Sequence, residues 1–93
     1  MPETVTIHIP TPFRGQAGDQ ATFDANGGTV GEVLGALSGR YPELGRRLFK
    51  TEGELNRFVN IFVNEEDIRF LDNLETSVAP GDDILIIPAI AGG

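Results

Sequence analysis

The chain has 93 residues, and its 14 acidic against 7 basic residues give a formal net charge of −7 at pH 7. That length fits one domain built around one core. The charge excludes a nucleic-acid binder that works by neutralising phosphates, and it favours a basic protein partner. Cysteine is absent, which excludes a disulfide framework, a thiol nucleophile and a thiolate metal site.

The first segments along the chain predict two short strands. Residues 4–10, "TVTIHIP", alternate apolar and polar side chains, as in a strand with one buried face. Residues 11–20 contain two glycines and a proline and predict a loop. Residues 21–25 then predict a second strand, and "NGG" at 26–28 predicts a turn.

A helix is expected to begin at Thr29. Thr29 and Glu32 have the spacing of a capping box, and Gly39 and Pro42 mark the end of the helix. The apolar residues that follow the cap recur at helical spacing and predict one buried stripe: Val30, Val33, Leu34, Leu37 and Tyr41. Residues 42–49 predict one further helical turn or a short second helix.

The second half of the chain predicts a hairpin and a final strand. In residues 57–70, "RFVNIFVNEEDIRF", alternating side chains lead into an acidic turn, and Ile68 and Phe70 are expected on one side of the returning strand. Residues 71–82 form a connection. The last strand, "DILIIP", is almost continuously apolar, which predicts a central position that is covered on both faces or by a partner.

The resulting order of elements is strand, strand, helix, strand, strand, strand. One main helix against a small mixed sheet is an α+β fold in two layers, and the β-grasp arrangement fits this order best. A ferredoxin-like fold would need a second full helix, for which residues 42–49 are a weak candidate. We expect a β-grasp domain over residues 1–87 and an extended tail over residues 88–93.

The sequence predicts no catalytic centre and no bound metal or cofactor. His8 is the single histidine, and no cysteine accompanies it as a metal ligand. The carboxylates of residues 65–67 and 82–83 fall in predicted turns, where solvated charges are usual. Ser38 and Ser77 lack a recognisable base. We therefore expect a protein that is not itself an enzyme.

The final residues, "IIPAIAGG", suggest where the function lies. Gly92 and Gly93 have no side chains, so they suit a narrow channel that any Cβ would block. The α-carboxylate of Gly93 is then suited to activation as an acyl-adenylate inside the active site of another protein.

These features resemble the ubiquitin-like sulfur carriers of the MoaD/ThiS family. The resemblance extends over nearly the whole chain and is carried by residues 57–70 and 81–93, with residues 9–10 and the helix opening at 27–37 consistent with it. Within the family, the chain is most similar to the carrier of a cysteine-biosynthesis route. The Gly-Gly end is typical of the whole class and says less about the pathway.

The resemblance implies a set of partner enzymes. An E1-like adenylating and sulfurtransferase enzyme would activate Gly93 with ATP and Mg²⁺, and sulfide or a persulfide donor would convert it to a thiocarboxylate. The sulfur would then pass to a cysteine synthase dependent on pyridoxal phosphate, and a metalloprotease would release cysteine from the tail. Alternatively, the tail would enter the large subunit of molybdopterin synthase. All these cofactors would belong to the partners.

A partner-docking surface is expected beside the tail. If the odd-numbered residues of 59–63 face the helix, the even-numbered ones face away and join the last strand and tail in an apolar surface. The candidate docking residues are Phe58, Asn60, Phe62, Leu85, Ile87, Pro88, Ile90 and Ala91. A reversed parity, or a cover formed by residues 42–49 or by a second copy, would remove this surface. Arg69 is expected to be solvated.

Two other functions remain open at this point. A ubiquitin-like modifier joined to lysines would share the tail and the activating enzyme, and a plain interaction module would have an incidental glycine end. Residues 84–91 form the longest apolar stretch, which is too short to span a membrane. The N-terminus lacks the pattern of a secretory leader, so a cytoplasmic protein is expected.

Overall fold

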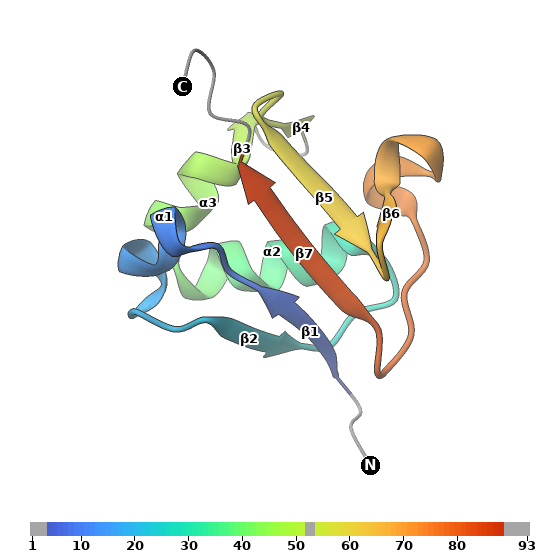
Figure 1. Cartoon of the computed structure of the whole chain (residues 1–93), viewed down its shortest axis with the longest axis horizontal. Helices are drawn as coiled ribbons and strands as arrows, with labels where there is room; N and C mark the ends of the chain where they lie inside the picture. Colours follow the sequence, from blue (N-terminus) through green and yellow to red (C-terminus); the bar gives the residue numbers. More distant parts are fainter. Residues whose placement is uncertain (1–3, 52–53, 89–93) are drawn as a thin grey trace.

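A five-stranded mixed sheet organises the computed structural model, which describes residues 4–51 and 54–88. The strand order is β2-β1-β7-β5-β6, with β1 parallel to β7 and the other neighbours antiparallel (Figure 1). The strands of this sheet are β1 (Val5–His8), β2 (Thr22–Ala25), β5 (Val59–Val63), β6 (Glu66–Asp67) and β7 (Asp83–Pro88). This order, with the first and last strands side by side, is the predicted β-grasp arrangement.

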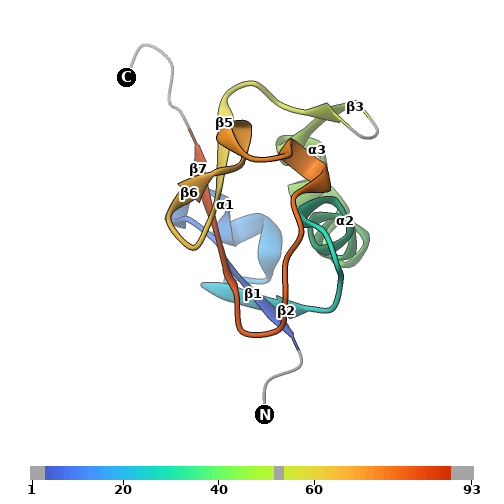
Figure 2. The same cartoon turned by 90° about the vertical axis from the view of Figure 1, so that its right-hand side faces the viewer.

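The two longest helices lie together on one side of the sheet (Figure 2). They are α2 (Val30–Arg40) and α3 (Pro42–Leu48), so the short second helix expected over residues 42–49 is present. The remaining elements are short: α1 (Thr11–Arg14), the 3-10 helices η1 (Gly15–Ala17), η2 (Ile68–Phe70) and η3 (Asn73–Glu75), and a two-stranded sheet of β3 (Phe49–Thr51) and β4 (Glu54–Leu55).

The start of α2 has the predicted cap with one difference. Thr29 Oγ1 accepts a hydrogen bond from the backbone N–H of Glu32 at 3.2 Å. The Glu32 carboxylate reaches one residue further back than a standard capping box and accepts from the N–H of Gly28 at 2.7 Å. The N–H of Val30 donates to the carbonyl of Thr76 at 3.0 Å, which ties the helix to the segment before β7.

The core lies between α2, α3 and the sheet. It combines the apolar stripe of α2 with alternate side chains from β1, β5 and β7, and this agrees with the predicted helical and strand periodicities. Its largest fully buried side chains include Ile7, Ile9, Leu34, Leu37, Leu44, Leu48, Ile61, Ile68, Ile84 and Ile86.

Residues 11–20 differ from the predicted loop, since they form α1 and η1. Pro12 occupies the first turn of α1, where its fixed φ suits a helix and its missing N–H is not needed. Gly18 then ends η1 at a φ of +63°, which glycine adopts without strain. The glycines and proline therefore punctuate short helices here.

The hairpin after β5 is tighter than expected. The turn consists of Asn64 and Glu65 alone, with φ values of 48° and 75°, as in a two-residue turn with left-handed backbone. The prediction that Ile68 and Phe70 share one side is wrong. Both lie in η2, where a spacing of about three residues per turn replaces strand alternation, and Ile68 is 2% exposed while Phe70 is 86% exposed.

The central position predicted for the last strand is confirmed, but the described residues cover β7 on one face only. Ile84 and Ile86 are buried under the helices, whereas Leu85 and Ile87 point to the opposite face and are exposed. The strand is apolar on both faces although only one face meets the core.

The contact between α2 and α3 generates a stability prediction. A Cβ on Gly45 would overlap Ser38, lying 2.8 Å from its Cβ and 3.2 Å from its Cα. Gly45→Ala should therefore destabilise the protein by about 1–3 kcal/mol through overpacking. Gly35→Ala is the matched control, because a Cβ there meets nothing within 4 Å.

Urea unfolding of both variants measures the difference. Gly35→Ala should raise the free energy of unfolding by about 0.5–1 kcal/mol, since alanine is the better helix former. Equal stability of the two variants would contradict the close approach of the helices.

Candidate functional site

Alternate side chains of β5 and β7 form an apolar patch on the face of the sheet away from the helices. The strand register pairs Phe62 with Leu85 and Asn60 with Ile87, so residues far apart in the sequence become neighbours. Phe58, immediately before β5, is 45% exposed, and Leu85 is 42% exposed. We call Phe58, Asn60, Phe62, Leu85 and Ile87 the β5–β7 patch.

The parity predicted for this patch is confirmed. Val59, Ile61 and Val63 are buried, and the even-numbered neighbours face away from the core. Residues 42–49 do not cover the patch, because α3 packs against α2 on the other side of the sheet (Figure 2). That a partner binds here stays a prediction.

The patch lies next to the point where the chain continues toward its last residues. Pro88 is the last residue of β7 and pairs with Val59, so the strand extends one residue beyond the predicted domain boundary. The other residues expected in the site, Ile90, Ala91, Gly92 and Gly93, lie outside the described residues.

The two ends of the patch differ in charge. Beside the start of β5, the Arg57 guanidinium lies 5.3 Å from the centre of the Phe58 ring, which is a cation–π contact. At the far end, His8 Nε2 lies 3.0 Å from Asp83 Oδ1, and the acidic turn residue Glu65 is nearby. His8 thus contacts Asp83 at the surface, in agreement with the expected surface position.

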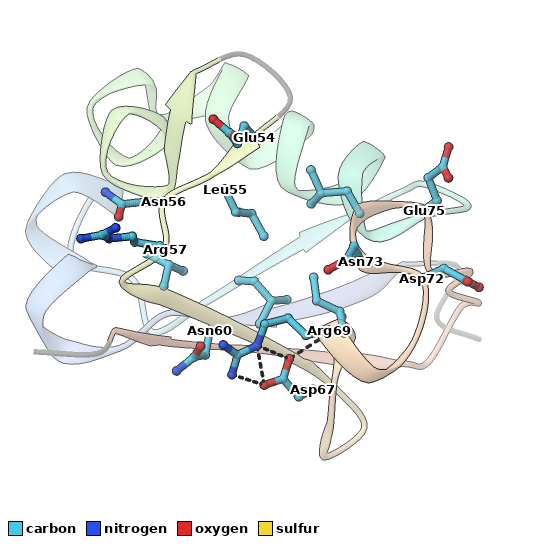
Figure 3. Close-up of a pocket in the computed structure, with 14 residues that line it drawn as sticks. Glu54, Leu55, Asn56, Arg57, Asn60, Asp67, Arg69, Asp72, Asn73 and Glu75 are labelled. Carbon is cyan, nitrogen blue, oxygen red and sulfur yellow. Dashed lines mark hydrogen bonds and ion pairs between the residues drawn. The ribbon is translucent and has the colours of Figure 1, made fainter.

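A separate pocket of about 510 Å³ opens beside the outer edge of β5 (Figure 3). Apolar side chains from four elements line its interior: Leu55, Val59, Ile61, Ile68 and Leu74. Polar and charged residues stand around it, among them Asn73 and Arg69. No sequence signal predicted this pocket, because it forms only where β4 and η3 converge on β5.

Asp67 and Arg69 form the best-defined ion pair at this pocket. Arg69 Nη2 lies 2.7 Å and Nε lies 3.1 Å from Asp67 Oδ2, and the backbone N–H of Arg69 donates to Asp67 Oδ1 at 2.8 Å (Figure 3). The Arg69 side chain and backbone hydrogen bonds lower the pKa of Asp67 below its ordinary value, and the same pair raises the pKa of Arg69. Arg69 is exposed, as expected, and it also pairs with Asp67, which was not expected.

The described part of the chain contains no group of three or more histidine, aspartate or glutamate side chains arranged to hold a metal. In residues 4–51 and 54–88, no helix has the length and apolar character needed to cross a membrane. The chemical features of the described residues are therefore an apolar face, its charged ends and the pocket beside β5.

The family model described as "ThiS family" matches residues 7–93. The sulfur carrier protein CysO of Mycobacterium tuberculosis is 45% identical over 91 residues, which cover 96% of this chain and 98% of the relative. Both likenesses span nearly the whole chain, including the residues of the β5–β7 patch.

Solved structures share the fold as well as the sequence. A chain of the BexX/CysO complex of Amycolatopsis orientalis has 42% identity and a TM-score of 0.87, and the match covers 96% of this chain and 99% of that one. The small archaeal modifier protein 1 of Methanosarcina acetivorans has 30% identity and a TM-score of 0.86, with 100% and 99% covered.

The Asp67–Arg69 pair predicts a pH dependence of stability. Because the folded-state pKa of Asp67 lies below the unfolded value of about 3.9, the pair stabilises the fold above that value and loses its effect as the pH falls through the folded pKa. Asp67→Asn should therefore be less stable than the wild type at pH 6, and the difference should shrink as the pH falls below 4.

Urea unfolding of both proteins between pH 2 and pH 6 provides the measurement. Asp72→Asn, an exposed acid at the same pocket, serves as the control and should follow the wild type. A difference between wild type and Asp67→Asn that stays constant with pH would contradict this account of the pair.

Proposed function

The chain belongs to the ThiS family, and we propose that it is a sulfur carrier whose Gly93 carboxylate becomes a thiocarboxylate that supplies sulfur for cysteine biosynthesis. The observation that carries this proposal is the 45% identity to the sulfur carrier CysO over almost the full length of both chains. The family match continues to Gly93, the residue on which the chemistry depends.

The reaction needs an activated acyl group. The Gly93 carboxylate would attack the α-phosphorus of ATP and release pyrophosphate, giving an acyl-adenylate. Sulfide would then displace AMP and leave a thiocarboxylate, with no change in oxidation state. An E1-like activating enzyme would bind the ATP and Mg²⁺, so the carrier would be a substrate of that enzyme, with no catalytic centre of its own.

The β5–β7 patch is the surface we assign to partner docking. Exposed aromatic and aliphatic side chains clustered on one face are typical of protein interfaces. Leu85 and Ile87 belong to the strand that leads into the last residues, so a partner that covers them stands beside the tail. A cysteine synthase dependent on pyridoxal phosphate would then receive the sulfur, and a metalloprotease would free the cysteine.

A second function has support of its own. The small archaeal modifier protein 1 of Methanosarcina acetivorans shares the fold over the whole chain at 30% identity. A modifier would use the same activated Gly93, with a lysine amine in place of sulfide. The higher identity to sulfur carriers favours sulfur transfer, and it favours the cysteine route over transfer to a molybdopterin precursor.

Deletion of Gly93 tests the carrier chemistry directly. The wild-type protein, incubated with the activating enzyme of its host, ATP, Mg²⁺ and sulfide, should gain the mass that replacement of one oxygen by sulfur produces. The chain lacking Gly93 should gain nothing while it unfolds at the same temperature as the wild type. Intact-mass spectrometry with fragmentation of the last three residues provides the readout.

The control is a glycine substitution that leaves the terminal residue in place. Gly39→Ala, on the surface of α2, should react like the wild type. Sulfur incorporation into the chain lacking Gly93 would contradict the proposal. Lysine-linked Gly-Gly remnants in digests of the host, without a thiocarboxylate, would favour the modifier.

Patch variants test the docking surface. Leu85→Ala combined with Ile87→Ala should raise the KM of the activating enzyme for the carrier about tenfold, since a loss near 1.4 kcal/mol is usual for buried interface anchors. Phe70→Ala is the matched control, because Phe70 is the most exposed large apolar side chain of the described residues and lies off the patch. An unchanged KM for the patch variant would contradict the proposal that the activating enzyme docks on this surface.

A further inference from the structure

The outer face of the sheet orders its residues in rows across the strands. Thr6 of β1 pairs with Asp24 of β2 and with Asp83 of β7, and His8 in the next row pairs with Leu85. Thr6 Oγ1 donates to Asp24 Oδ1 at 2.9 Å. The row that contains Thr6 therefore places two carboxylates on this face, and the following row begins the apolar surface.

A hollow of about 410 Å³ lies where the acidic row meets the β5–β7 patch. It is lined by His8, Asn64, Glu65, Asp83 and Leu85. Two carboxylates thus share the hollow with an apolar side chain that also belongs to the patch. This combination suits a lysine or arginine side chain, whose methylene stem packs on apolar surface while its charged end stays near carboxylates.

The hollow has a rigid frame. The backbone N–H of Asp83 donates to Asn64 Oδ1 at 3.0 Å, the Asn64 amide donates to Asp82 Oδ1 at 3.1 Å, and the Asn64 N–H donates to the Asp83 carbonyl at 2.9 Å. These bonds hold the tight turn of β5 and β6 against the start of β7. Little conformational freedom is lost when a partner binds such a preorganised surface.

The opposite end of the patch is basic. Arg57 stacks on Phe58 there, and Pro88 is the last strand residue before the tail. Ile87 lies four residues after Asp83, a distance of about 13 Å along β7. One face thus has carboxylates far from the tail, apolar side chains between, and an arginine close to it.

We propose that this charge difference sets the direction in which the activating enzyme docks, with a lysine or arginine side chain of that enzyme seated in the hollow between Glu65 and Asp83. The inference rests on the proposed function and names the chemistry of its partner. The apolar patch alone would permit two opposite orientations. Reversed docking would bring the enzyme's cation to Arg57 and would leave Glu65 without that cation and Asp83 with His8 as its one side-chain partner among the described residues.

A second copy of this chain is a poor occupant of the face. Each copy has a net charge of −7, and association of two such molecules opposes their mutual repulsion. A basic partner is attracted by the same charge. The activating enzyme, which must also receive the tail at the arginine end of the face, is therefore the occupant that fits both ends.

Charge reversal in the hollow tests the proposal. Asp83→Lys combined with Glu65→Lys should lower the association rate constant for the host's activating enzyme at least about tenfold at low ionic strength, and the salt dependence of association should weaken. The matched control is Glu43→Lys combined with Glu75→Lys, which makes the same change in net charge at exposed positions on α3 and η3, outside the β5–β7 patch and the hollow. Stopped-flow association at several salt concentrations gives the rates.

The outcomes separate the inference from the function on which it rests. Suppose that the wild type associates and forms thiocarboxylate but both double variants are slowed equally. The proposed binding of a cation in the hollow would then be overturned, and only the overall attraction between opposite net charges would remain. Rates unchanged in both would overturn it as well. If the reversed protein is unstable, Asp83→Asn combined with Glu65→Gln should still slow association severalfold. A wild type that never forms thiocarboxylate would overturn the proposed function itself.

Discussion

The placement of β7 between β1 and β5 is the constraint on which the rest of the structure depends. This strand pairs with β1 in parallel over residues 83–85 and with β5 in antiparallel over residues 84–88. Both registers put Ile84 and Ile86 under the helices. A slip of one residue would exchange them with Leu85 and Ile87 and turn the buried side outward. All four side chains are large and aliphatic, so their hydrophobicity does not decide which pair is buried. The hydrogen-bonded registers of β7 with β1 and β5 must therefore select the buried face.

The same placement relates the candidate site to the tail. A central strand cannot shift without breaking two ladders, so the surface formed by β5 and β7 has a fixed geometry relative to Pro88. A carrier that presents its last residues to several enzymes needs such a reference surface, because a partner locates the reacting carboxylate by docking on the domain. The function proposed here therefore requires no cavity within the chain.

The pocket beside β5 has a different role from the face. Its clearest polar feature, the Asp67–Arg69 pair, satisfies a carboxylate whose side chain is only 7% exposed. The pair also follows the two-residue turn and precedes the exposed Phe70. We interpret the Asp67–Arg69 pair as protection of the sheet edge. It lies where β6 ends after two residues, and a short, charged edge strand discourages pairing with other strands.

Sulfur carriers and protein modifiers share this fold, so the fold alone does not separate the two functions. Both use an activated terminal carboxyl group, and they differ in the nucleophile that accepts it. We propose that the difference lies in the partner enzymes, which would dock on the outer face of the sheet. If partners dock as proposed, the charged residues beside the patch, such as Glu65 and Asp83, are better placed than the core to select the partner enzyme.

The sequence by itself determined the β-grasp order, the cap and buried stripe of α2, the alternation of β5 and the glycine end, because each depends on a local period or on neighbouring residues. It did not determine which face of β7 is covered, since "DILIIP" offers aliphatic side chains to both. Nor did it indicate the Asp67–Arg69 pair or the hollow beside His8. These depend on strands that meet only when the sheet is assembled, and only the tertiary structure decided them.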